Sequence, residues 1–95
     1  MKSQSNFVAV HLLVQGRVQG VGFRFFAQET AENLGLVGWV QNRPDGSVEA
    51  YAEGKKEILE DWIRRLRKGP PLSRVGDVIM EWRTPQGDLR SYCIR

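Results

Sequence analysis

The residues with the clearest chemical potential are glycines grouped around one arginine, between Gln15 and Arg24. Gly16, Gly20 and Gly22 let the backbone adopt conformations that a Cβ atom would forbid. Such a turn can direct consecutive N–H groups at one point, and the first turn of a following helix adds unpaired donors and a partial positive charge. Arg24 would lie at the helix end of this loop, where its planar guanidinium suits phosphate oxygens. The segment therefore predicts an anion-binding site.

This loop differs from the common nucleotide-binding motifs. The Lys-Ser/Thr pair of a P-loop is missing, and Gly20-Val21-Gly22 lacks the third glycine of the dinucleotide fingerprint. The sequence also has no His, Cys, Asp and Glu cluster with metal-ligand spacing, and no pairing of a nucleophile with a base. We therefore expect an anion site that uses no metal and no cofactor.

Asn42 is the second polar residue of interest, because asparagine is depleted in strands and this one ends an apolar run. Its amide can both donate and accept hydrogen bonds. Position alone favours a turn-initiating asparagine, since Arg43-Pro44-Asp45-Gly46 follows directly.

The elements that must position these groups follow from the spacing of apolar residues. Apolar residues at helical spacing predict helices over 23–34 and 55–68, and shorter apolar or alternating runs predict strands over 7–14, 36–42, 47–53, 77–82 and 89–94. This order is that of an α+β, ferredoxin-like βαββαβ sandwich, with two helices on one face of an antiparallel sheet and a short extra C-terminal strand at an edge. We expect one domain over residues 1–95, with residues 1–6 flexible.

Several finer expectations concern the sheet. Residues 7–14 are apolar on both faces, which predicts a central strand. This agrees with the ferredoxin-like topology, which puts the first strand beside the third. His11 is expected to be a partnered sheet histidine. Residues 47–53 alternate cleanly and predict a strand with one solvated face. Cys93 is expected to be a small buried residue near the C-terminus.

Composition narrows the class of protein without naming an activity. The chain carries a net charge of +3, which favours anionic ligands but is too mild to require nucleic acid. One cysteine cannot form an internal disulfide, which favours a reducing compartment. The sequence shows neither a signal peptide nor an apolar run of membrane-spanning length. We expect a cytoplasmic protein.

Two segments resemble motifs of the acylphosphatase family. Gly16-Arg17-Val18-Gln19-Gly20-Val21-Gly22-Phe23-Arg24 is similar to the first motif, and Gly38-Trp39-Val40-Gln41-Asn42, followed by Asp45-Gly46 and Val48-Glu49, is similar to the second. The length and the element order also fit, so the resemblance covers nearly the whole chain.

The resemblance implies metal-independent hydrolysis of the carboxyl–phosphate bond of acyl phosphates, an acid-anhydride hydrolase that releases carboxylate and inorganic phosphate. It places the phosphate-binding arginine at Arg24 and the water-orienting asparagine at Asn42. The expected phosphate-binding residues are Gln19, Gly20, Val21, Gly22, Phe23 and Arg24. The expected partners are small molecules, with no nucleic acid and no membrane, and the expected state is a monomer. Arg17 is expected to be a solvated loop residue.

Two other functions use the same fold. An RNA-binding module is one, because Gly20–Phe26 partly imitates the aromatic octamer of RNA-recognition domains. That octamer belongs on a central strand, however, whereas here it would open a helix. A noncatalytic anion-binding or regulatory domain is the other, and the presence of both Arg24 and Asn42 argues against it.

Overall fold

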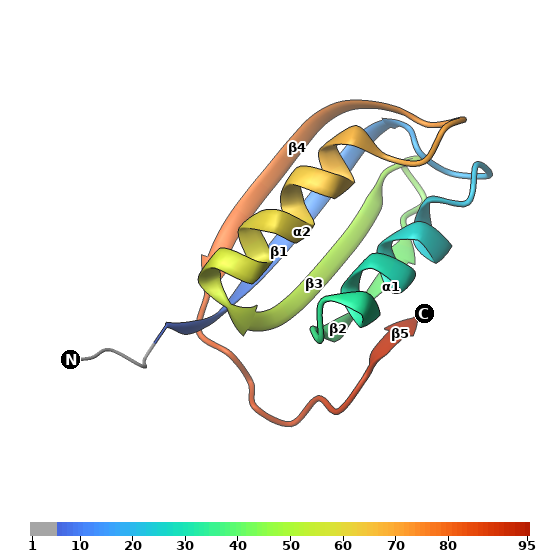
Figure 1. The fold of residues 1–95 in the computed structure, drawn as a ribbon. Coiled ribbons are helices and arrows are strands. Elements are labelled where there is room, and N and C mark those ends of the chain that lie inside the picture. The colour runs from blue at the N-terminus through green and yellow to red at the C-terminus, as the bar shows by residue number, and fades with distance from the viewer. Residues whose placement is uncertain (1–5) are drawn as a thin grey trace.

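The computed structural model describes residues 6–95, in which strands and helices follow the expected order (Figure 1). The elements are β1 Phe7–Arg17, α1 Phe23–Asn33, β2 Val37–Asn42, β3 Val48–Lys55, α2 Lys56–Lys68, β4 Arg74–Arg83 and β5 Tyr92–Ile94. Of the segment expected to be flexible, residues 1–5 lie outside the described part. Asn6 is described, and its main-chain oxygen accepts a hydrogen bond of 3.0 Å from the Lys56 N–H.

The strands form one sheet in the order β4-β1-β3-β2-β5. β1 pairs antiparallel with both β3 and β4, and β3 pairs antiparallel with β2. The short β5 pairs parallel with β2 at the edge, so the sheet as a whole is mixed. Both helices lie on the same face (Figure 1). The ferredoxin-like βαββαβ arrangement is thus confirmed, with β1 and β3 adjacent inside the sheet.

The core lies between this sheet and the two helices. Val10, Leu12 and Val14 of β1 alternate toward it and are fully buried. From the helices, the apolar stripes at helical spacing pack against them, as the sequence predicts. The buried helix residues include Phe23, Ala27, Ala31, Leu59, Trp62, Ile63 and Leu66.

The opposite face of β3 is less open than its alternation predicts. Tyr51 and Glu53, on the face expected to be solvated, are only 3% and 2% exposed. The Tyr51 hydroxyl donates to Glu53 Oε2 at 2.6 Å, and the main-chain N–H of Gln86 donates to the same oxygen at 2.7 Å. The connection from β4 to β5 therefore covers this end of β3. That segment is far away in the sequence, so local alternation could not predict its contact.

Two further expectations are corrected at the C-terminal edge. Cys93 is exposed, because Tyr92 is the residue of β5 that turns toward the helices and is buried. The last strand is also shorter than predicted, starting at Tyr92 rather than at residue 89. Neither helix in the described part of the chain is long and apolar enough to cross a membrane.

Candidate active site

The glycine loop leaves β1 and turns into α1 through residues with positive φ. Gly20 has φ +74° and Gly22 has φ +79°, values that side-chain-bearing residues adopt only with strain. Gly16 has φ +123° beside a register shift in the pairing of β1 with β4, and a Cβ atom there would lie 2.3 Å from the Arg74 carbonyl oxygen. The glycine spacing is therefore required by the shape of the chain.

The start of α1 presents unpaired main-chain donors. The Phe26 N–H donates to the Gly22 oxygen at 3.0 Å, whereas the N–H groups of residues 23–25 have no carbonyl partner within residues 6–95. No side chain caps this end, and its first turn holds no acidic residue. Phe23 is 1% exposed and anchors the helix start in the core. The helix therefore offers its positive end to whatever lies beside the loop.

A pocket of about 170 Å³ lies at this junction. Gly20, Gly22, Phe23 and Arg24 line it from the loop and helix, and Asn42 lines it from the end of β2. Asn42 is brought there by the pairing of β2 with β3, in which it lies opposite Val48. Two segments separated in the sequence thus meet in one pocket, and each contributes one of the predicted catalytic side chains.

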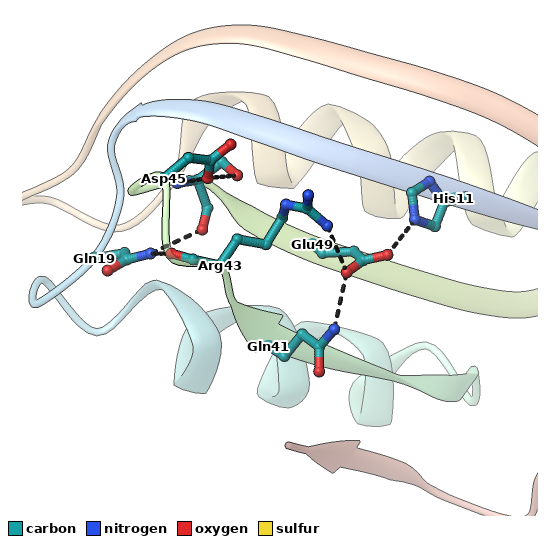
Figure 2. A network of polar contacts seen from close by, with 7 residues as sticks. His11, Gln19, Gln41, Arg43, Asp45 and Glu49 are labelled. Atoms are coloured by element: carbon teal, nitrogen blue, oxygen red, sulfur yellow. Dashed lines mark hydrogen bonds and ion pairs between the residues drawn. The ribbon is translucent and has the colours of Figure 1, made fainter.

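Gln19 and Val21, which we also expected to bind phosphate, are not among the lining residues. The Gln19 side-chain amide turns away and donates to the Arg43 oxygen at 2.7 Å and to the Ser47 oxygen at 2.9 Å (Figure 2). Val21 packs against the core. In this conformation Gln19 connects the glycine loop to the turn that follows Asn42.

Three lining residues were missed from the sequence: Val18, Phe25 and Ile94. Phe25 is 65% exposed and lies off the apolar stripe of α1. An aromatic residue off that stripe and directly after Arg24 is a signal that the sequence did offer. Ile94 had no sequence signal, because it reaches the pocket only through the pairing of β5 with β2. Phe25 and Ile94 give the pocket an apolar wall.

The Arg24 guanidinium lies close to the last residue of the chain. Its Nη1 donates to the main-chain oxygen of Arg95 at 3.4 Å, and the Arg95 N–H donates to the Val40 oxygen at 2.8 Å. The Arg95 side chain lies over the Trp39 ring, 4.5 Å from its centroid. β5 and the residue after it therefore hold one side of the pocket in place.

The turn after Asn42 is held by its own side chains. Asp45 Oδ1 accepts hydrogen bonds from the Ser47 hydroxyl at 2.6 Å and from the Ser47 N–H at 2.9 Å. These bonds from Ser47 hold the pKa of the Asp45 carboxyl below its ordinary value. Gly46 takes φ +94°, which completes the turn. The predicted turn over residues 43–46 is thus present and internally braced.

The remaining polar candidates lie outside the pocket. His11 Nε2 is 2.7 Å from Glu49 Oε2, which confirms that it is a partnered sheet histidine. Arg17 is exposed, as expected, but it is the last residue of β1, opposite Arg74 of β4, and not a loop residue. Within residues 6–95, no three His, Cys, Asp or Glu side chains gather in a way that could hold a metal ion.

The chain and its fold have counterparts among known proteins. Residues 10–94 match the sequence profile of the Acylphosphatase family. A protein of Trichormus variabilis named acylphosphatase is 49% identical over 92 residues, which covers 97% of this chain and 90% of that protein. Among solved structures, the acylphosphatase from Bacillus subtilis superposes with a TM-score of 0.89 at 38% identity, covering 93% of this chain and 98% of its own. The one from Coxiella burnetii gives 0.91 at 34% identity, covering 100% and 99%.

Proposed function

The chain belongs to the acylphosphatase family, and from that premise we propose that Arg24 and Asn42 carry out the hydrolysis of acyl phosphates in the pocket between α1 and β2. The reaction is that of an acid-anhydride hydrolase: water attacks phosphorus, the carboxyl–phosphate bond breaks, and carboxylate and inorganic phosphate leave.

The chemistry of the leaving group explains why so few side chains suffice. A departing carboxylate has a conjugate acid with a pKa of roughly 4, so it needs no proton from a general acid. Phosphoryl transfer then depends mainly on positioning and on stabilising negative charge. We propose that neither a metal ion nor a cofactor takes part.

Arg24 and the loop are proposed to bind the phosphoryl group. The Arg24 guanidinium offers a planar fork of donors, and the unpaired N–H groups at the start of α1 offer more in the same place. The expected donors extend over Gln19–Phe23, because two positive-φ glycines can turn successive N–H groups toward one anion.

Asn42 is proposed to hold the attacking water. It lines the pocket from β2, separate from the loop that supplies the phosphate donors. Its amide can accept a hydrogen bond from water and donate one to the phosphoryl group, which would fix the water on the side away from the leaving carboxylate. Phe25 and Ile94, which form the apolar wall of the pocket, are proposed to contact the acyl group.

The observation that carries this proposal is the convergence of Arg24 and Asn42 on one pocket. The test is hydrolysis of benzoyl phosphate by the purified protein, with and without a chelator of divalent ions. We expect full activity in the chelator and poor hydrolysis of phosphate monoesters, since an alkoxide leaves far less readily than a carboxylate. Activity lost in the chelator and restored by a divalent ion would overturn the metal-free mechanism.

We further propose that the protein works in the cytoplasm as a monomeric single domain whose partners are small molecules rather than nucleic acid or membrane. The net charge of +3 is too mild to require a nucleic-acid partner. On the open face of the sheet, Tyr51 is only 3% exposed and so offers little ring surface for stacking on a base. Size-exclusion chromatography tests the monomeric state, and titration with single-stranded RNA tests the absence of nucleic-acid binding.

A further inference from the structure

The Glu49 carboxylate, on the open face of the sheet, accepts hydrogen bonds from Gln41 and Arg43, the residues directly before and after Asn42. Glu49 lies on β3, opposite Gln41 of β2. Its Oε1 accepts hydrogen bonds from Gln41 Nε2 at 2.8 Å and from Arg43 Nη1 at 3.3 Å, and its Oε2 is 2.7 Å from His11 Nε2 (Figure 2). The Glu49 side chain is 15% exposed. Three side chains from three strands, together with Arg43 directly after β2, thus meet away from the pocket.

Because side chains alternate between the two faces along a strand, this cluster bears on the orientation of Asn42. Side chains of successive residues point to opposite faces, so Gln41 and Arg43 share the open face and Asn42 points the other way. A shift of one residue would reverse all three. The hydrogen bonds to Glu49 hold the side chains of Gln41 and Arg43, the two neighbours of Asn42, on the open face.

The negative charge of Glu49 strengthens its hydrogen bonds to Gln41 and Arg43 near neutral pH. Burial raises the pKa of the Glu49 carboxyl, but hydrogen bonds from His11, Gln41 and Arg43 outweigh that effect and hold the pKa below its ordinary value. The carboxylate is therefore ionised, and an ionised acceptor forms stronger hydrogen bonds than a neutral one.

We propose that Glu49 is a positioning residue for hydrolysis: through Gln41 and Arg43 it sets the place of the Asn42 amide, and His11 holds the Glu49 carboxylate in turn. The inference rests on the proposed role of Asn42 in orienting water. It assigns no contact with substrate to Glu49, because the carboxylate lies on the other face of the sheet.

A second carboxylate on the same strand provides a matched control. Glu53 lies on the same face of β3, is 2% exposed, and accepts hydrogen bonds from the Tyr51 hydroxyl and the Gln86 N–H. None of its partners adjoins Asn42. If loss of a buried carboxylate acted only by weakening the sheet, Glu53→Ala would reduce turnover as much as Glu49→Ala does.

The experiment measures kcat for benzoyl phosphate and the inhibition constant of inorganic phosphate in both single variants, in Asn42→Ala and in Asn42→Ala/Glu49→Ala. By analogy with partners that orient metal ligands, we expect Glu49→Ala to lower kcat by about 10-fold or more. The phosphate inhibition constant should change by less than about 2-fold, since Arg24 is untouched, and Glu53→Ala should leave kcat within about 2-fold. Adding Glu49→Ala to Asn42→Ala should cause no further loss, since coupled residues are not additive.

The outcomes separate the two proposals. An Asn42→Ala variant with normal kcat would overturn the proposed function of Asn42. A large loss of kcat in Asn42→Ala with none in Glu49→Ala would overturn the positioning role alone. The same role would be overturned if Glu49→Ala lowered kcat as much in the Asn42→Ala background as it does alone, or if Glu53→Ala lowered kcat as much as Glu49→Ala. If Glu49→Ala does not fold, Arg43→Met makes the same test, because it removes one bond to Glu49 and leaves those from His11 and Gln41.

Discussion

The two walls of the pocket are built in different ways. The loop wall, residues 18–22 with the start of α1, takes its shape from its own backbone, in which Gly20 and Gly22 have positive φ. The turn wall, Asn42 with residues 43–47, is held by side-chain hydrogen bonds from several parts of the chain, among them those of Gln19 and Glu49. The loop wall depends on local conformation, whereas the turn wall adds distant partners to its local hydrogen bonds between Asp45 and Ser47.

This difference suggests a division of work. An anion needs several donors aimed at one point, which a short run of positive-φ glycines and a helix start can supply together. A water molecule in line with a breaking bond needs one amide in one place, and a misplacement of 1 Å can cost about 100-fold in rate. Rigid support from neighbouring strands suits that second task.

The largest effect is expected at Arg24 in the loop wall. Arg24→Gln should lower kcat/KM by at least about 10²–10³-fold and weaken inhibition by phosphate, because a forked charge-assisted contact is lost. Arg24→Lys should restore little, since a point charge cannot grip two oxygens in one plane. The fold should survive, because a cation at the positive end of a helix contributes little stability.

Arg17→Gln is the control for this prediction, since Arg17 is also a loop-side arginine but is exposed outside the pocket. Its effect should be clearly smaller. Steady-state kinetics with benzoyl phosphate and circular dichroism on both variants make the comparison. Equal losses at the two positions would contradict the assignment of Arg24.

The next effect is expected at Asn42 in the turn wall, and it should differ in kind. Asn42→Ala should reduce kcat by roughly 10²-fold or more, by analogy with the loss of one preorganised polar group. Inorganic phosphate should still bind nearly as well, because its donors lie in the loop wall. Competitive inhibition by phosphate measures this. If phosphate binding collapses together with turnover, Asn42 is a phosphate ligand and the two walls share one task.

The same contrast explains what the sequence could predict. The loop wall was recognisable because glycine spacing, a helix start and Arg24 are adjacent in the chain, and the resemblance to a known motif lies in the same residues. The helices and β1 were predictable because burial imposes regular spacing on apolar residues. The prediction that Asn42 joins Arg24 came from the resemblance, since position alone favoured a simple turn.

The support of the turn wall could not be predicted, for a physical reason. The contact of His11 with Glu49 depends on the register between β1 and β3, and a change of one residue would separate them. The burial of Glu53 depends on a segment more than thirty residues later, whose Gln86 N–H donates to the Glu53 carboxylate. Short-range alternation contains no information on either.

Gln19 links the two walls, and its substitution should have a smaller effect than substitution of Arg24 or Asn42. Gln19→Ala removes both hydrogen bonds to the turn, at Arg43 and Ser47. We expect the free energy of unfolding to fall by about 1–3 kcal/mol, from two hydrogen bonds of about 0.5–1.5 kcal/mol each. Urea unfolding measures this, and kcat should fall more than the affinity for phosphate does. An unchanged stability would show that the walls hold their places independently.

The smallest effect concerns pH and again separates the walls. Residues 18–22 contain no titratable side chain, whereas the turn wall depends on Asp45 and Glu49, whose pKa values are both lowered in the folded protein. A carboxyl with a lowered folded pKa adds stability above its unfolded pKa, here 3.8 for Asp45 and 4.5 for Glu49, and that stability is lost as the pH falls through the folded value. We therefore expect the free energy of unfolding to decline as the pH falls below about 4.5. In Glu49→Gln the decline should be shallower, because the glutamine has no proton to gain. Urea unfolding at several pH values measures both slopes, and parallel curves for the two proteins would contradict the assigned role of the Glu49 charge.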